Sequence, residues 1–250
     1  MADFKFPYPR PKQLSDPYNY NSPQGLARLL QKADSALDWN DLRLILGPFL
    51  PAGNYEESAY FYPLAFDRAL NHEDEAFDIQ TSLVWFASEH WMQIENDNAG
   101  DAIRIGLTHC LHHWNAEFKV VHFDDAQCRE KGWQRNYSDL VWMSENVIEF
   151  LNDLIRFETH ADLAFSYFES LSKPSDPIKS AWFLELARSH VARDVYRLKN
   201  HRLQQILDDE TLGIEHANVL REDIDIIAES PTYWRDTFAI LSMPIEHNGG

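Results

Sequence analysis

The stretch that decides the fold class is SDLVWMSENVIEFLNDLIRFETHADLAFSYFESL, residues 138–171. Its apolar side chains recur every three or four positions, which is the spacing of one face of an α-helix. The stripe consists of Leu140, Val141, Val147, Ile148, Leu151, Leu154, Ile155, Phe157, Ala161, Phe165 and Phe168. A single helix of this length is unusual in a globular protein, so the pattern allows a break near Thr159.

Helical patterns of the same kind extend through the rest of the chain. Ser22 and Pro23 are typical of a helix start, with serine as the N-cap and proline at the first helical position. Asn54 and Glu57 have the spacing of a capping box. The predicted helices are 23–36, 41–46, 55–70 with Pro63 inside, 73–97, 101–121, 124–131, 138–171, 177–197, 199–208, 214–228 and 230–243. No alternation of apolar and polar residues is long enough to predict a sheet.

These patterns predict an all-α fold, with one domain of about nine to ten mostly antiparallel helices over residues 24–244. Residues 1–23 are rich in proline and tyrosine, which predicts an extended arm on the helical body. Residues 245–250 end in Asn-Gly-Gly and are expected to be a disordered tail.

The negative charge is concentrated in two segments. The chain has 40 acidic and 22 basic residues, for a formal net charge of −18. Residues 51–101 hold eleven acids against Arg68 alone, and residues 203–250 hold ten acids against Arg221 and Arg235. This balance argues against partners that carry phosphate, such as nucleic acids and anionic membranes. The two segments are either solvated surface or an acidic face that attracts a basic protein.

The cysteine content and the N-terminal residues favour the cytoplasm. Cys110 and Cys128 are the only cysteines, so a disulfide scaffold is not expected. The first residues form no apolar run typical of a signal peptide, and no stretch has the length of a membrane span. No phosphate loop, dinucleotide fingerprint or nucleophile motif is found, so we expect no cofactor.

One helix carries the densest group of histidines. His109 and His113 are four residues apart and could chelate a transition metal from one helix face. Because a metal site needs more converging ligands than one helix offers, and because the HExxH pattern is missing, metal binding is a weak alternative.

Four polar residues in or beside apolar stripes are candidates for catalysis. They are His90, Glu158, His160 and Glu185. Each of them also has a structural explanation. Glu185, for example, lies three residues before Arg188 on a helix that is apolar on several faces, so the two can form a buried ion pair. A helical enzyme with a His/Glu site, with or without a metal, requires these side chains to converge.

The function that we predict from these patterns is binding of a basic protein partner. The predicted contact residues are Glu56, Glu57, Glu73, Asp74, Glu75, Asp78, Asp208, Asp209, Glu210, Glu222, Asp223, Asp225 and Trp234. In kind, such a chain resembles the acidic inhibitors and immunity proteins with which bacteria neutralise toxins, and the resemblance implies a toxin as the basic partner. The oligomeric state is open, with a homodimer among the alternatives.

Overall fold

All regular secondary structure in the described residues of this protein is helical. The computed structural model describes residues 4–47, 50–71, 76–123, 137–192 and 197–222. These ranges contain eleven α-helices and two short 3-10 helices, and no strand. The all-α prediction is therefore confirmed. The predicted helices 124–131 and 230–243 and the predicted tail 245–250 lie outside the described residues.

Residue contacts divide the chain into two units, which are described in turn. Unit 1 comprises Met1–Cys110 and Arg156–Leu163, and unit 2 comprises Leu111–Ile155 and Ala164–Gly250. The single domain over 24–244 stays a prediction. Among the described residues, no helix combines the length and the hydropathy that a membrane span requires.

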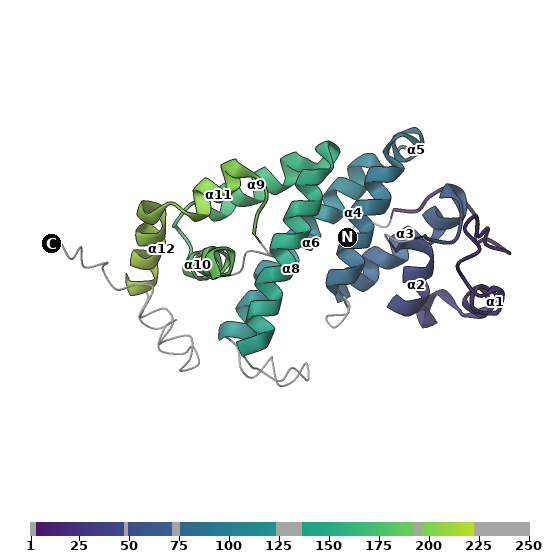
Figure 1. Cartoon of the computed structure of the whole chain (residues 1–250), viewed down its shortest axis with the longest axis horizontal. Coiled ribbons are helices and arrows are strands. Elements are labelled where there is room, and N and C mark those ends of the chain that lie inside the picture. The colour runs from purple at the N-terminus through teal and green to yellow at the C-terminus, as the bar shows by residue number, and fades with distance from the viewer. Residues whose placement is uncertain (1–3, 48–49, 72–75, 124–136, 193–196, 223–250) are drawn as a thin grey trace. The chain divides into compact units, whose positions relative to one another are not determined.

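Unit 1 contains the arm and the helices of the N-terminal half (Figure 1). Its complete elements are α1 (Pro23–Gln31), η1 (Asp34–Ala36), α2 (Trp39–Leu46), α3 (Tyr55–Asn71), α4 (Ala76–Glu89), α5 (Trp91–Asn96) and η3 (Glu158–His160), and it also holds the first part of α6 (Gly100–Phe123).

The predicted helix starts are found where side chains satisfy free backbone N–H groups. The Ser22 hydroxyl accepts a hydrogen bond from the Gly25 N–H at 3.1 Å. Asn54 and Glu57 form the expected capping box, with both hydrogen bonds at 3.0 Å. α3 continues through Pro63 to its end.

One predicted helix is wrong as a single element. The stretch 73–97 is divided, because α4 ends at Glu89 and His90 has non-helical backbone angles (φ −111°, ψ 20°) before α5. His90 is therefore the N-cap residue of α5, and it is half-buried instead of lying in the core. The apolar stripe continues through this point and gives no sign of the break.

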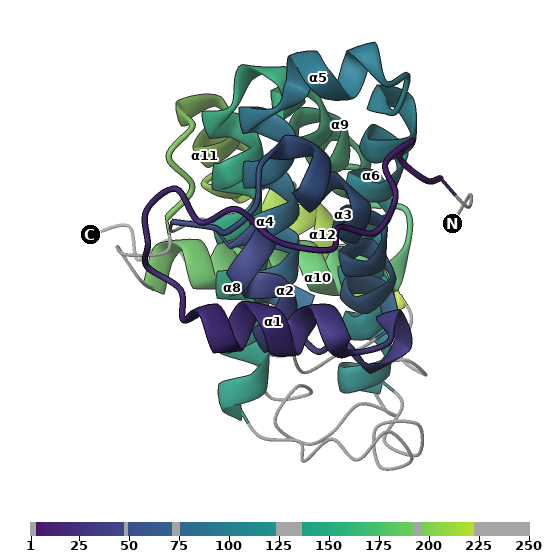
Figure 2. The same cartoon turned by 90° about the vertical axis from the view of Figure 1, so that its right-hand side faces the viewer.

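The core of unit 1 is aromatic and the arm closes over part of it. The side chains of Phe61, Tyr62 and Phe66 on α3 are fully buried, and the Tyr62 hydroxyl donates to the Leu83 carbonyl of α4 at 2.7 Å. Phe6 of the arm is also buried and packs against Tyr62. Figure 2 shows the arm in purple, crossing in front of the helices before it reaches α1.

Unit 2 is built around α10 (Pro177–Ala192). Residues 181–186 of this helix are buried on all sides, as the sequence predicts for a central helix. The Trp182 indole donates to the Tyr167 hydroxyl at 2.8 Å, which donates to the Asn115 side chain at 2.7 Å. The other elements are the second part of α6, α8 (Tyr137–Arg156), α9 (Ala161–Leu171), α11 (His201–Leu207) and α12 (Glu210–Glu222), and α8 and α9 each extend into unit 1 at one end.

The break allowed near Thr159 is confirmed. α8 ends at Arg156, the 3-10 turn η3 follows, and α9 begins at Ala161.

Candidate functional site: the acidic end of unit 1

Several helix termini meet at one end of unit 1. Because α3 and α4 are antiparallel neighbours, the start of α3 lies beside the end of α4, and the Tyr55 ring stacks on Phe86 at 6.0 Å. α5 and the start of α6 follow directly in the chain. A Cβ atom on Gly100 would collide with the Glu95 carboxylate, so Glu95 lies over the start of α6.

This arrangement gathers five carboxylates from four elements and the loop between α5 and α6. We call them the acidic end, and they are Glu56, Glu89, Glu95, Asp97 and Asp101. Asp97 is half-buried and the other four are exposed. None of the five forms an ion pair within the part of the chain that the structure describes. Their negative charge is therefore left uncompensated at the surface, where it sets up a long-range field.

Two tyrosines hold Asp97 and fasten the arm to the acidic end. The hydroxyls of Tyr8 and Tyr55 donate to the Asp97 carboxylate at 2.9 and 2.7 Å. Partial burial, the hydrogen bond to Asp97 and the charges of Asp97 and Glu56 raise the pKa of Tyr8 to about 12. The Asp97 carboxylate thus has a structural role at this end. The four exposed carboxylates are the ones that a partner can reach.

Glu57 fastens a second point of the arm. Its carboxylate accepts the Ser15 N–H at 3.0 Å, the Ser15 hydroxyl at 2.6 Å and the Asn54 N–H at 3.0 Å. Burial opposes ionisation of Glu57, but these hydrogen bonds outweigh it and lower its pKa. Glu57 is one of the predicted contact residues, and its carboxylate accepts hydrogen bonds from Ser15 and Asn54 of the same chain.

Replacing Tyr8 with phenylalanine should loosen the arm. The Y8F substitution removes the hydrogen bond to Asp97 and should lower the free energy of unfolding by about 1 kcal/mol. We expect faster trypsin cleavage after Lys12 in the folded protein. Tyr20→Phe is the control, because the Tyr20 ring is 72% exposed. Equal cleavage rates for both variants would show that this hydrogen bond does not hold the arm.

Two of the predicted contact residues of unit 1 lie at opposite ends of the α3–α4 pair. Glu56 lies at the acidic end, whereas Asp78 lies near the start of α4 and accepts a hydrogen bond from the Trp39 indole at 3.4 Å. α3 has 17 residues and is about 25 Å long, which separates these two carboxylates. The residues Glu73, Asp74, Glu75, Asp223, Asp225 and Trp234 lie outside the described part of the chain.

The second acidic segment belongs to unit 2. Asp208, Asp209, Glu210 and Glu222 are exposed there. The Asp209 side chain accepts the N–H groups of Thr211 and Leu212 at 2.9 and 3.1 Å and so caps α12. Since residues 51–101 and 203–222 fall in different units, a common acidic face stays a prediction.

The four residues of the enzyme alternative occupy separate environments. His90 is half-buried against the Tyr55 and Phe86 rings, and burial lowers its pKa. Glu158 is exposed, and His160 is buried with its ring edge-on to Trp91 at 5.0 Å. No hydrogen bond or ion pair joins these three among the described residues. The fourth residue, Glu185, belongs to unit 2.

The two histidines of the weak metal alternative differ in exposure. His109 is exposed and His113 is half-buried beside Trp114. In the described ranges, no group of three or more His, Cys, Asp or Glu side chains is arranged to hold a metal ion.

The residues that complete the acidic end have no local sequence signal. Tyr8 and Asp97 are 89 positions apart, and only the folded arm brings them together. The comparisons add no further residue, since no protein-family model, no curated protein and no solved structure matches this chain.

Proposed function

We propose that this chain is an acidic, helical protein-binding module whose ligand is a basic protein, and that it acts as an inhibitor of the immunity type. The observation that carries this proposal is the acidic end, whose carboxylates have no cationic partner among the described residues. Uncompensated charge on a surface lowers the stability of the free protein slightly and accelerates association with a partner of opposite charge.

The acidic end also has features of a specific contact surface. Its carboxylates project from helix termini and the turns between them, so little backbone conformational entropy is lost when a partner binds. Met92 of α5 is 79% exposed within the same region. An apolar side chain surrounded by charged groups is a typical composition for an interface in which the rim is polar and the centre is dry.

Charge reversal at the acidic end tests the proposal. Glu89 and Glu95 lie in the last turns of α4 and α5, where lysine is favourable to those helices. Because the Glu95 carboxylate also lies over the start of α6, where lysine is unfavourable, the thermal stability of E89K/E95K is measured beside its capture of partners. The matched control is D67K/E169K, which makes the same change in net charge at two exposed positions outside the acidic end. Basic proteins captured from native lysate at low salt should be lost from E89K/E95K and kept by the control.

The inhibitor activity has its own readout. Where a reading frame for a small basic toxin lies beside the gene, co-expression of the wild type or of the control should protect cells, and E89K/E95K should not. Retention of no basic protein at low salt would refute the proposal. Equal capture by the two charge variants would show that the contact lies elsewhere.

A further inference from the structure

Two large aromatic side chains project from a turn in the arm. Tyr18 and Tyr20 are 60% and 72% exposed, although both are ring systems that proteins usually cover in part. We call residues 16–21 the tyrosine turn. A single exposed apolar residue is ordinary, whereas two aromatic rings within three positions form a concentrated apolar surface.

The tyrosine turn is held in one conformation. The Asn19 N–H donates to the Asp16 carbonyl at 3.1 Å, and the Asn21 N–H donates to the Asp16 carboxylate at 2.8 Å. Asn19 has a φ of 49°, a left-handed conformation that asparagine tolerates better than most residues. Because the turn is already ordered, the two tyrosines can bind a partner at a low entropic cost.

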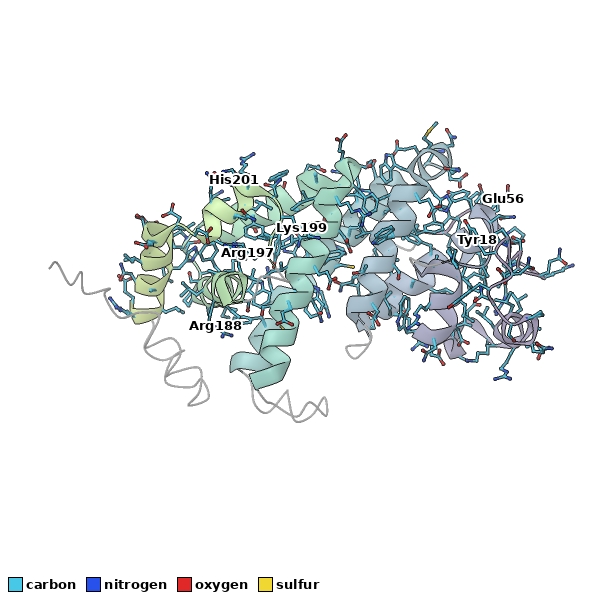
Figure 3. All side chains as sticks on the ribbon, in the orientation of Figure 1. Tyr18, Glu56, Arg188, Arg197, Lys199 and His201 are labelled. Carbon is cyan, nitrogen blue, oxygen red and sulfur yellow. The ribbon has the colours of Figure 1, made fainter. Side chains whose placement is uncertain are left out.

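The base of the turn is fixed to the first turn of α3. Ser15 donates two hydrogen bonds to Glu57, and the Gly53 N–H donates to the Ser15 carbonyl at 2.6 Å. Tyr18 is three residues from Ser15, so their Cα atoms are within about 11 Å of each other. Glu56, the neighbour of Glu57, is exposed at the acidic end. Figure 3 labels Tyr18 and Glu56 in the same region of unit 1.

A groove lies directly beside the tyrosine turn. Its volume is about 560 Å³, and it is lined by Lys12 of the arm, by Asp16 and Asn19 of the turn and by Leu26 and Leu30 of α1. This volume is sufficient for one or two apolar side chains of a partner. The turn therefore has two exposed rings and a groove beside it with apolar side chains in its lining, and its base is bonded to the helix turn that carries Glu56.

We infer that the tyrosine turn is the anchor for an arginine-bearing segment of the basic partner. A guanidinium group can pack on the face of Tyr18 or of Tyr20, Glu56 supplies an exposed carboxylate on the adjoining turn of α3, and an apolar neighbour of that arginine can enter the groove. Charge complementarity selects this occupant, because Glu56 beside the base of the turn forms no ion pair in the described structure. The inference rests on the proposed function and names the part of unit 1 that recognises the partner.

The test uses a defined probe, a fluorescent peptide in which arginine alternates with leucine and serine, and a second peptide with glutamate in place of arginine. Binding is measured by fluorescence anisotropy at low salt. Wild type should bind the arginine peptide and not the glutamate peptide. Y18A/Y20A should bind about tenfold more weakly, and Y18F/Y20F should bind as wild type does because both ring faces remain. Ile214→Ala, at another exposed apolar residue, is the control and should have no effect.

The outcomes separate this inference from the proposed function. If the arginine peptide binds and E89K/E95K weakens it while Y18A/Y20A does not, the turn is not the anchor and the acidic module stands. If the arginine peptide does not bind wild type, the turn is not an arginine site, and the lysate experiment still decides the proposed function. A dimer in sedimentation that Y18A/Y20A abolishes would assign the turn to a second copy of this chain and overturn the inference.

Discussion

Lowering the pH from 7 to 5 should reduce the free energy of unfolding by about 2 kcal/mol for each buried histidine whose pKa is about 4 in the folded chain, and each unit contains one such residue. In unit 1 this residue is His160. Its side chain is fully buried, and neither ring nitrogen meets the geometry of a hydrogen bond among the described residues. Burial, helped by the positive charge of Arg104 and opposed by Asp162, lowers the pKa of His160 to about 4.

Unit 2 contains two fully buried histidines. Burial lowers the pKa of His190, although the charge of Asp208 opposes this shift. The other buried histidine is His216. Its ring stacks on Phe183 at 4.1 Å, and its Nδ1 atom lies 3.0 Å from the Ser180 hydroxyl. Burial lowers its pKa to about 4 as well. Below pH 6.5 each histidine takes up a proton in the unfolded chain and stays neutral in the folded one. Stability is therefore lost as the pH falls from 6.5 towards 4, and the loss is complete below that value.

Urea unfolding at pH 7 and pH 5 measures this effect. His160→Gln and His216→Gln should each lower the stability at pH 7 and flatten its pH dependence in the unit concerned. His201→Gln is the matched control, since His201 is exposed on α11 and should leave the pH dependence unchanged. Equal stability of the wild type at both pH values would contradict the burial of His160 and His216 as neutral imidazoles.

The helices could be predicted from sequence because their determinants are local. Apolar spacing located α8, α9 and α10, and the Ser22 and Asn54 caps located the starts of α1 and α3. The start of α2 was predicted two residues late. Its capping box uses aspartate at both positions, Asp38 and Asp41, in place of the usual Ser/Thr and Glu pair.

The site was predictable only in part, because its geometry depends on contacts that are distant in sequence. Charge counting located the acid-rich segment 51–101, but counting does not distinguish the two ends of a helical hairpin. The prediction from charge counting therefore places Glu56 and Asp78 in the same contact set, and it includes Glu57 among the exposed contact residues. The hydrogen bonds from the arm to Asp97 and Glu57 join residues separated by 89 and 42 positions, and no local pattern reports them.

Replacing Arg188 with alanine should cause the largest loss of stability in unit 2. Glu185 is fully buried, and Arg188 donates to both of its carboxylate oxygens, through Nε at 3.1 Å and through Nη2. The Ser189 hydroxyl adds a hydrogen bond at 3.3 Å. Burial raises the pKa of Glu185, although these hydrogen bonds act in the opposite direction. Without the guanidinium, a carboxylate is left in an apolar interior, which should cost about 3 kcal/mol or more.

The double variant E185Q/R188A separates the lost charge pairing from lost packing. If the buried charge causes the destabilisation, glutamine at position 185 should recover most of the lost free energy, and R188A alone should approach wild type as the pH falls and Glu185 becomes protonated. Arg202→Ala is the control, because Arg202 is an exposed arginine that packs over the Phe165 ring at 5.3 Å. Chemical unfolding of the four proteins at pH 7 and pH 5 gives both comparisons. Two outcomes would mean that Arg188 does not hold the Glu185 carboxylate as a buried charge. One is an R188A variant as stable as wild type at pH 7, and the other is a double variant no more stable than R188A.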